Sequence, residues 1–165
     1  MFTHSTPSFP AIVARAALFG VAAGLRSMTP NGVLASERND SSVHGRWKTW
    51  PVLRSNRGRI ALQLAWIGEL VGDKLPGVPP RTNPGPLAGR TLFGALAGAA
   101  IGTQREGASS MIASVLAGAA GGFAGSHAGY LYRSRLAAKT GLPDLPLALA
   151  EDVAAWAIAE KALRG

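Results

Sequence analysis

The sequence predicts an all-α, glycine-rich transmembrane bundle of four or five helices, some of them short or broken, in one domain of 165 residues. Hydrophobic residues make up 47% of the chain and charged residues only 16%, below the roughly one quarter found in soluble domains. The chain also has 21 glycines, which let helices approach closely in lipid. Apolar segments separated by glycine, proline or charge are expected at about 11–30, 59–75, 87–103, 108–132 and 145–162.

Residues 11–25 are expected to form a retained first helix, because the N-terminus lacks the basic region of a signal peptide and Arg15 interrupts the apolar run. Short or broken helices are expected near Pro30 and Pro76. A bilayer crossing needs about 20 apolar residues, and only 108–132 is comfortably that long. The other segments must therefore use polar flanks, tilt, or stop partway as re-entrant helices. The competing interpretation is a soluble helical bundle whose buried helices are short and rich in alanine.

Residues 31–58 form one polar segment, interpreted as a cytoplasmic loop of the single integral membrane domain. Trp47 and Trp50 lie beside Arg46 and Lys48, and tryptophan with basic residues is typical of a membrane interface. A solvated loop whose tryptophans lie against the bundle is the alternative.

The net charge of +8 raises nucleic acid as a partner, but the distribution of charge argues against it. Seven of the 17 basic residues lie between residues 26 and 59, as expected for a cytoplasmic segment facing anionic lipid. We therefore expect a lipid bilayer as the partner and no nucleic acid. If all five segments cross, the positive-inside rule favours a cytoplasmic C-terminus and an external N-terminus.

Glycines recur every fourth residue, and this spacing places them on one helix face. The two longer series are Gly94, Gly98 and Gly102, and Gly121, Gly125 and Gly129. They predict that the third and fourth segments pack against each other, and a seam between copies in a homo-oligomer is the alternative. A shorter pattern is repeated as Gly20, Gly24, Arg26, Pro30 and Gly68, Gly72, Lys74, Pro76.

Glu69 and Asp73 are four residues apart, so both carboxylates lie on one face of the second segment. When two acids lie so close together and are partly desolvated, they favour binding of a proton or a cation. Such binding is the elementary step of ion coupling. The alternative is structural: a basic residue pairs with them and fixes helix ends, and the candidates are Lys74, Arg81, Arg90 and Arg26.

Glu151 and Asp152 form a second acidic pair near the C-terminus. Adjacent positions diverge by about 100° around a helix, so we expect only one of them to face the centre of the bundle, where it would complete a cluster with Glu69 and Asp73. An amphipathic helix with both acids toward water or headgroups is the alternative.

Other chemistry is poorly supported by the sequence. The chain has no cysteine, which excludes disulfides, thiol catalysis and thiolate metal sites. The three histidines, His4, His44 and His127, lack metal-ligand spacing, and no nucleophile elbow, Walker or dinucleotide motif occurs. We therefore expect no enzyme activity, no cofactor and no metal.

Four motifs resemble the uncharacterised bacterial family named domain of unknown function 4126. They are GLRSMTP at 24–30, GELVGDKLPG at 68–77, PLAGR at 86–90 and LAEDV at 149–153, in that order along the chain. The resemblance implies a small multi-pass protein of the bacterial inner membrane with no assigned reaction. It also implies that the recurrent polar residues fall on Arg26, Glu69, Asp73, Lys74, Glu151 and Asp152. It is weakest at 37–59, where family members are often more apolar.

The candidate cluster for an ion or small solute thus consists of Arg26, Glu69, Asp73, Lys74, Arg90, Glu151 and Asp152. The function expected first is a small transporter or an ion- or proton-conducting protein that uses these acids. The alternative is a non-catalytic membrane scaffold or interaction protein whose buried charges are structural ion pairs.

Overall fold

The computed structural model describes residues 7–72 and 81–165, and within these ranges the chain is helical and has no strand. The helices are α1 (Phe9–Leu25), α2 (Thr29–Glu37), the 3-10 helix η1 (Arg46–Thr49), α3 (Pro51–Arg54), α4 (Asn56–Gly72), α5 (Pro84–Gly102), α6 (Ala108–Thr140) and α7 (Asp144–Arg164). The all-α prediction is confirmed for the described residues.

The first apolar segment, 11–30, contains the expected helix at 11–25, which is α1, and the start of a second helix, α2. The chain turns by 120° between α1 and α2. Arg26 ends α1 in an extended conformation (φ −143°, ψ 109°), and Pro30 lies in the first turn of α2. A proline is tolerated in a first turn, where its missing N–H has no intrahelical partner, whereas inside a continuous helix it would remove a hydrogen bond and clash. The sequence GLRSMTP therefore breaks the helix before Pro30.

Residues 31–58, predicted as a loop, are largely helical in the structure, because the end of α2, η1, α3 and the start of α4 fall within this segment. Pro51 begins α3, and its fixed φ suits a first helical position. The fourth segment is also longer than predicted. It continues past residue 132 to Thr140, where Gly141 ends α6 in the left-handed conformation (φ 66°) that favours glycine.

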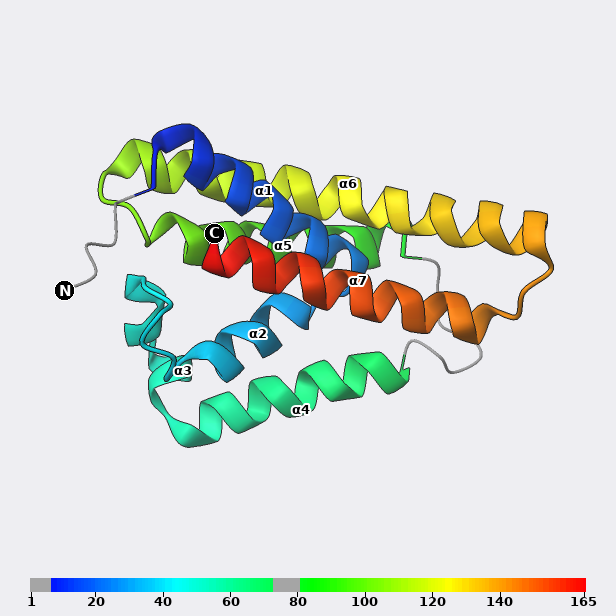
Figure 1. The fold of residues 1–165 in the computed structure, drawn as a ribbon, viewed down its shortest axis with the longest axis horizontal. Coiled ribbons are helices and arrows are strands. Elements are labelled where there is room, and N and C mark those ends of the chain that lie inside the picture. Colours follow the sequence, from blue (N-terminus) through cyan, green and yellow to red (C-terminus); the bar gives the residue numbers. More distant parts are fainter. Residues whose placement is uncertain (1–6, 73–80) are drawn as a thin grey trace.

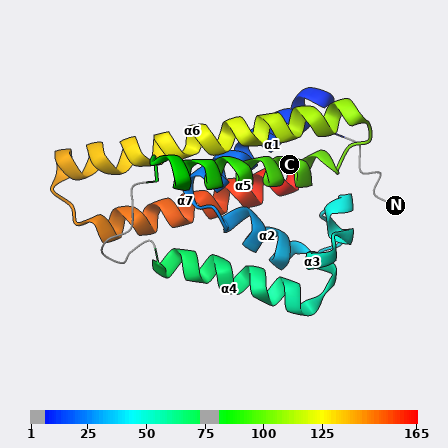
Figure 2. The ribbon, with the colours of Figure 1, turned by 180° about the vertical axis from the view of Figure 1, so that it is seen from behind.

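Helices α1, α5 and α6 form the most closely packed part of the molecule, with α7 along α1. The two opposite views show α1 on one side of this group and α5 on the other, with the long α6 extending beyond both (Figure 1, Figure 2). Helix α4 lies at the edge, packed on α2 and α3. It contains no buried residue.

Glycines bring the backbones of α1, α5 and α6 into contact. A Cβ atom added at Gly98 would lie 2.1 Å from the carbonyl oxygen of Ser114, and one at Gly20 would lie 2.1 Å from that of Gly118. No real Cβ tolerates such distances, so these positions require glycine. The close approach of the third and fourth predicted segments, now α5 and α6, is thus made within one chain.

Both described ends of the chain lie at the same end of the bundle, which we call the termini end (Figure 1). Arg105 donates to the carbonyl oxygen of Pro7 (2.9 Å), and Gln104 donates to that of Leu163 (3.1 Å). The expectation of termini on opposite sides is therefore wrong, because α2 returns the chain toward the end where α1 began.

The interior combines an apolar core, which includes Ile12, Phe19 and Trp47, with several buried polar side chains, and many large apolar side chains lie on the outside. Arg26, Ser114, Ser126 and Glu151 are buried. Several large apolar side chains are more than half exposed: Leu64, Ile67, Val71, Leu92, Ile112, Leu116, Leu145, Leu149 and Val153. Among the described residues, α6 alone is long and apolar enough to cross a bilayer, and the bent pair α1 and α2 meets the same criterion together; a buried helix of a soluble protein can also meet it.

Candidate functional site

The break between α1 and α2 is surrounded by charged side chains from four other parts of the chain. We call this group the charged centre; its members are Arg26, Glu69, Arg81, Arg90, Glu151 and Asp152. It brings together five of the seven predicted site residues. The other two, Asp73 and Lys74, lie outside the described residues.

The end of α1 is capped by two arginines. The last carbonyl groups of a helix lack intrahelical partners and carry partial negative charge. Arg90 donates through Nη1 to the carbonyl oxygens of Gly24 (3.2 Å) and Leu25 (2.9 Å), and Arg81 donates to that of Leu25 (3.3 Å). These guanidinium groups therefore satisfy the open end of α1 and compensate its dipole.

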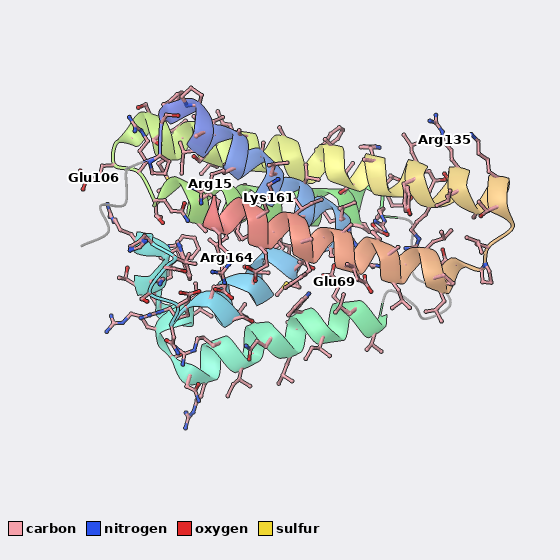
Figure 3. The ribbon with its side chains drawn as sticks, in the orientation of Figure 1. Arg15, Glu69, Glu106, Arg135, Lys161 and Arg164 are labelled. Atoms are coloured by element: carbon pink, nitrogen blue, oxygen red, sulfur yellow. The ribbon has the colours of Figure 1, made fainter. Side chains whose placement is uncertain are left out.

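The start of α2 is capped by a carboxylate from another helix. Glu69 of α4 accepts hydrogen bonds from the backbone N–H and the hydroxyl of Ser27 and from the N–H of Met28, each at 2.7 Å. A carboxylate is favourable at a helix N-terminus, where free N–H groups and the dipole are both positive. Figure 3 shows Glu69 on the side of α4 that faces the bundle.

Trp66, one turn before Glu69, makes the second contact of α4 with α2. Its indole nitrogen donates to the hydroxyl of Thr29 at 3.1 Å, and its ring lies over Gly32, where a Cβ would come within 2.4 Å. Glu69 and Trp66 together fix α4 to the first turns of α2.

The two acids of α7 both reach Arg26. Asp152 Oδ1 lies 2.5 Å from Nε of Arg26, and Glu151 Oε2 lies 3.9 Å from its Nη2. The prediction that only one of them faces the centre is wrong: the Arg26 side chain, which is fully buried, presents different nitrogens to the two diverging carboxylates.

Glu151 contacts more arginines than any other described acid of the site. Arg81 binds it in a two-pronged ion pair, with Nη2 to Oε2 at 3.1 Å, and Arg133 Nη1 lies 3.6 Å from Oε2. The Glu151 side chain is 2% exposed. Gly129 makes room for this pair, because a Cβ there would lie 2.7 Å from Nη1 of Arg81 and 2.8 Å from Oε1 of Glu151.

Arg81 and Arg133 both contact Glu151, and neither belongs to the predicted cluster. Arg81 is expected from the sequence only as a partner of Glu69 and Asp73. Arg81 lies between prolines, with its carboxylate partner 70 residues away, so no local spacing connects them. Arg133 was placed outside the fourth helix, because that helix was predicted to end at residue 132. Recognising Gly141 as the end of the helix would have put Arg133 on the face of Gly129, four residues earlier.

The charged centre is rich in arginine, and its six described members carry equal numbers of positive and negative charges. Its three arginines, Arg26, Arg81 and Arg90, oppose three carboxylates, and arginine keeps its charge at any physiological pH. No group of three or more acids or histidines that could hold a metal ion occurs among the residues that the structure describes. The arrangement is thus suited to joining helix ends through ion pairs.

In comparisons with known proteins, no family model, no curated protein and no solved structure matches this chain.

Proposed function

We propose that the chain is a multi-pass protein of the bacterial inner membrane that acts as a non-catalytic scaffold, with its charged centre serving as a structural ion-pair network. The apolar exterior supports the membrane location. Exposed apolar side chains follow α4, α5, α6 and α7, whereas soluble monomers rarely expose contiguous apolar patches larger than a few hundred Å². Lipid tails would cover these faces, and the charges would be shielded inside.

The dimensions of the bundle also suit a bilayer. Helix α6 rises about 30 Å between Ala108 and Gly129, at about 1.5 Å per residue. This length matches the roughly 30 Å hydrocarbon core. Tyr130 and Tyr132 follow directly, and aromatic side chains of this kind favour the membrane interface. The charged centre lies beside Gly129, and therefore near one face of the proposed bilayer and away from its midplane.

The observation that carries the scaffold function is the environment of Glu151. This carboxylate is buried, paired on both oxygens with Arg81, and close to Arg26 and Arg133. Such a network fixes the relative positions of α1, α6, α7 and the segment before α5. Removing one partner of a buried pair leaves an uncompensated charge and is strongly destabilising.

The test uses the purified full chain in lipid vesicles, with Glu151→Gln compared against Glu160→Gln. Glu160 is a matched control. It lies on the same helix as Glu151 and also pairs with an arginine, Arg164, but its side chain is 18% exposed. We expect Glu151→Gln to lower the stability of the fold, Glu160→Gln to leave it nearly unchanged, and the parent protein to conduct no more protons or sodium ions than empty vesicles. Conduction by the parent above that background would contradict the scaffold function.

A second candidate, a small transporter or proton-conducting protein, is favoured by the position of Glu69. Its side chain is 13% exposed and lies between two half-helix ends, as ligands do in transporters with broken helices. It also belongs to a helix without buried residues, the least fixed of the long helices. Under this function the parent conducts, and Glu69→Gln abolishes conduction while the protein remains folded.

A further inference from the structure

The segment between α2 and α4 is fixed to the termini end of the bundle. Trp47 is fully buried in η1, and its backbone N–H donates to the hydroxyl of Thr103, next to the end of α5, at 3.1 Å. Leu53 of α3 is 1% exposed. Two buried apolar anchors therefore hold η1 and α3 against the bundle, and the side chains between them occupy defined positions on its surface.

Three arginines on this segment, Arg46, Arg54 and Arg57, are exposed and make no ion pair with any residue that the structure describes. The acids that precede them, Glu37 and Asp40, are bound by Arg164 of α7, which also contacts Glu160. Figure 3 shows Arg164 next to the segment that follows α2.

The remaining charged groups at this end do not neutralise the three arginines. Glu106, the other described acid at this end, makes no ion pair with them. Lys48 adds a further cation; it donates to the carbonyl oxygen of Asp40 and lies 5.6 Å from the Trp47 ring. Burial and the nearby Arg38 lower the pKa of Lys48, in keeping with an excess of positive charge around it. The charge of Arg46, Arg54 and Arg57 is thus directed outward.

Apolar side chains adjoin these arginines. Val52 is 43% exposed and Ile60 is 46% exposed. Trp50, which directly follows η1 in the chain, is half-buried. From Ile60 the exposed apolar face of α4 continues through Leu64 to Val71. Exposed arginines close in the chain to the start of an apolar helix face match the boundary between headgroups and acyl chains. Nucleic acid would offer phosphates but no partner for the apolar face.

We propose that Arg46, Arg54 and Arg57 form a binding surface for the headgroups of anionic phospholipids in the cytoplasmic leaflet, so that both ends of the chain face the cytoplasm. This inference rests on the proposed membrane location. Among the described residues at the opposite end, Arg133 is paired with Asp144, which leaves Arg135 and Lys139 as exposed cations. The positive-inside rule then assigns the termini end to the cytoplasm.

The binding test uses the full chain in mild detergent, titrated with phosphatidylglycerol or phosphatidylcholine, with bound lipids counted by native mass spectrometry. Arg54→Gln with Arg57→Gln is compared with Arg135→Gln with Lys139→Gln, which removes the same charge at the other end. We expect the parent to prefer phosphatidylglycerol, the first pair to reduce that affinity roughly thirtyfold, and the control to change it less than about threefold. Equal losses in both variants, no preference for phosphatidylglycerol, or tighter binding of a single-stranded oligonucleotide would overturn the proposal.

Orientation is tested separately, and the cysteine-free chain makes this simple. Single cysteines replace Ser41 at the termini end and Ser134 at the other, and intact cells are treated with a membrane-impermeant maleimide. We expect Ser134→Cys to react and Ser41→Cys to react only after lysis. Reaction of Ser41→Cys in intact cells overturns the orientation. Extraction of the chain from membranes by alkaline carbonate would instead contradict the proposed membrane location, so the two failures are distinguishable.

Discussion

Helices α1 and α4 carry the same short glycine pattern but occupy different environments. In α1, a Cβ at Gly24 would lie 2.3 Å from the carbonyl oxygen of Gly122, so the helix is in backbone contact with α6. In α4, no atom of the described residues lies within 4 Å of a Cβ at Gly68 or Gly72. Glycine spacing makes a small face on a helix, but the residues opposite decide whether that face is used. Here α6 offers its own glycines to α1, and nothing comparable faces α4.

The two helices are also held by different forces. Seven residues of α1 are buried, and its far end is completed by Arg81, Arg90 and the network around Glu151. Helix α4 has no buried residue and depends on polar contacts at its end, through Glu69 and Trp66. We therefore expect substitutions around α1 to affect the whole fold and substitutions in α4 to act locally.

The largest expected effect is that of Glu151→Gln. It leaves Arg81 buried without its carboxylate partner and removes one of the two acids beside Arg26, which should lower the free energy of unfolding by about 3–5 kcal/mol. Chemical denaturation of the reconstituted chain, followed by circular dichroism, measures it. The control Glu160→Gln should cost less than about 1 kcal/mol, because that pair is solvent-exposed. Equal effects would mean that the charged centre is not a structural network.

Alanine at matched glycines of α1 and α4 should act in opposite directions. Gly24→Ala places a methyl group against the α6 backbone and should destabilise by about 1–3 kcal/mol. Gly68→Ala has open space around it and should stabilise by roughly 0.5–1 kcal/mol, the gain in helix propensity. The same denaturation experiment reads both. A loss at Gly68 comparable with that at Gly24 would show that α4 is covered by a partner in the membrane.

Glu69→Gln should affect α4 more than the rest of the molecule. The amide keeps an oxygen for one donor but removes the charge at the start of α2, at a cost of about 1 kcal/mol. Hydrogen exchange should rise at Ser27, Met28 and along α4, with little change in α5 and α6. Faster exchange throughout the bundle would show that α4 is an integral part of the core.

Much of the helical pattern could be predicted from the sequence, because apolar runs bounded by glycine and proline specify helices locally. The end of the first helix at residue 25 and a break near Pro30 can be predicted from GLRSMTP. The sequence does not indicate that the helix beginning at Pro30 turns back toward the end where α1 began. This return places both described ends of the chain at the same end of the bundle.

Part of the charged centre was also predictable, since charged residues in an apolar chain must find partners. Arg26, Glu69, Arg90, Glu151 and Asp152 do come together. Their pairing was not predictable, because it depends on which helix ends meet. Glu69 caps α2 because that helix begins beside it, which no residue spacing indicates.

The smallest expected effect concerns the other end of α2, where Asp40 and Glu37 contact Arg164 and so attach the α2 and α4 region to α7. The backbone N–H of Ser42 first, and then the Ser42 hydroxyl and Arg164, lower the pKa of Asp40 well below its ordinary value of about 4. A carboxylate with a lowered pKa stabilises the fold above its unfolded-state pKa, and this contribution is lost as the pH falls toward the folded-state pKa. Asp40→Asn should therefore reduce stability slightly and equally between pH 8 and pH 5, and the difference from the parent should shrink below about pH 4. Thermal unfolding across this range measures it, and a difference that grows on acidification would show that the carboxylate does not stabilise this contact. A stability loss for Asp40→Asn that is smaller than the loss for Glu69→Gln would mean that α4 is held mainly at the end where Glu69 lies, beside the charged centre.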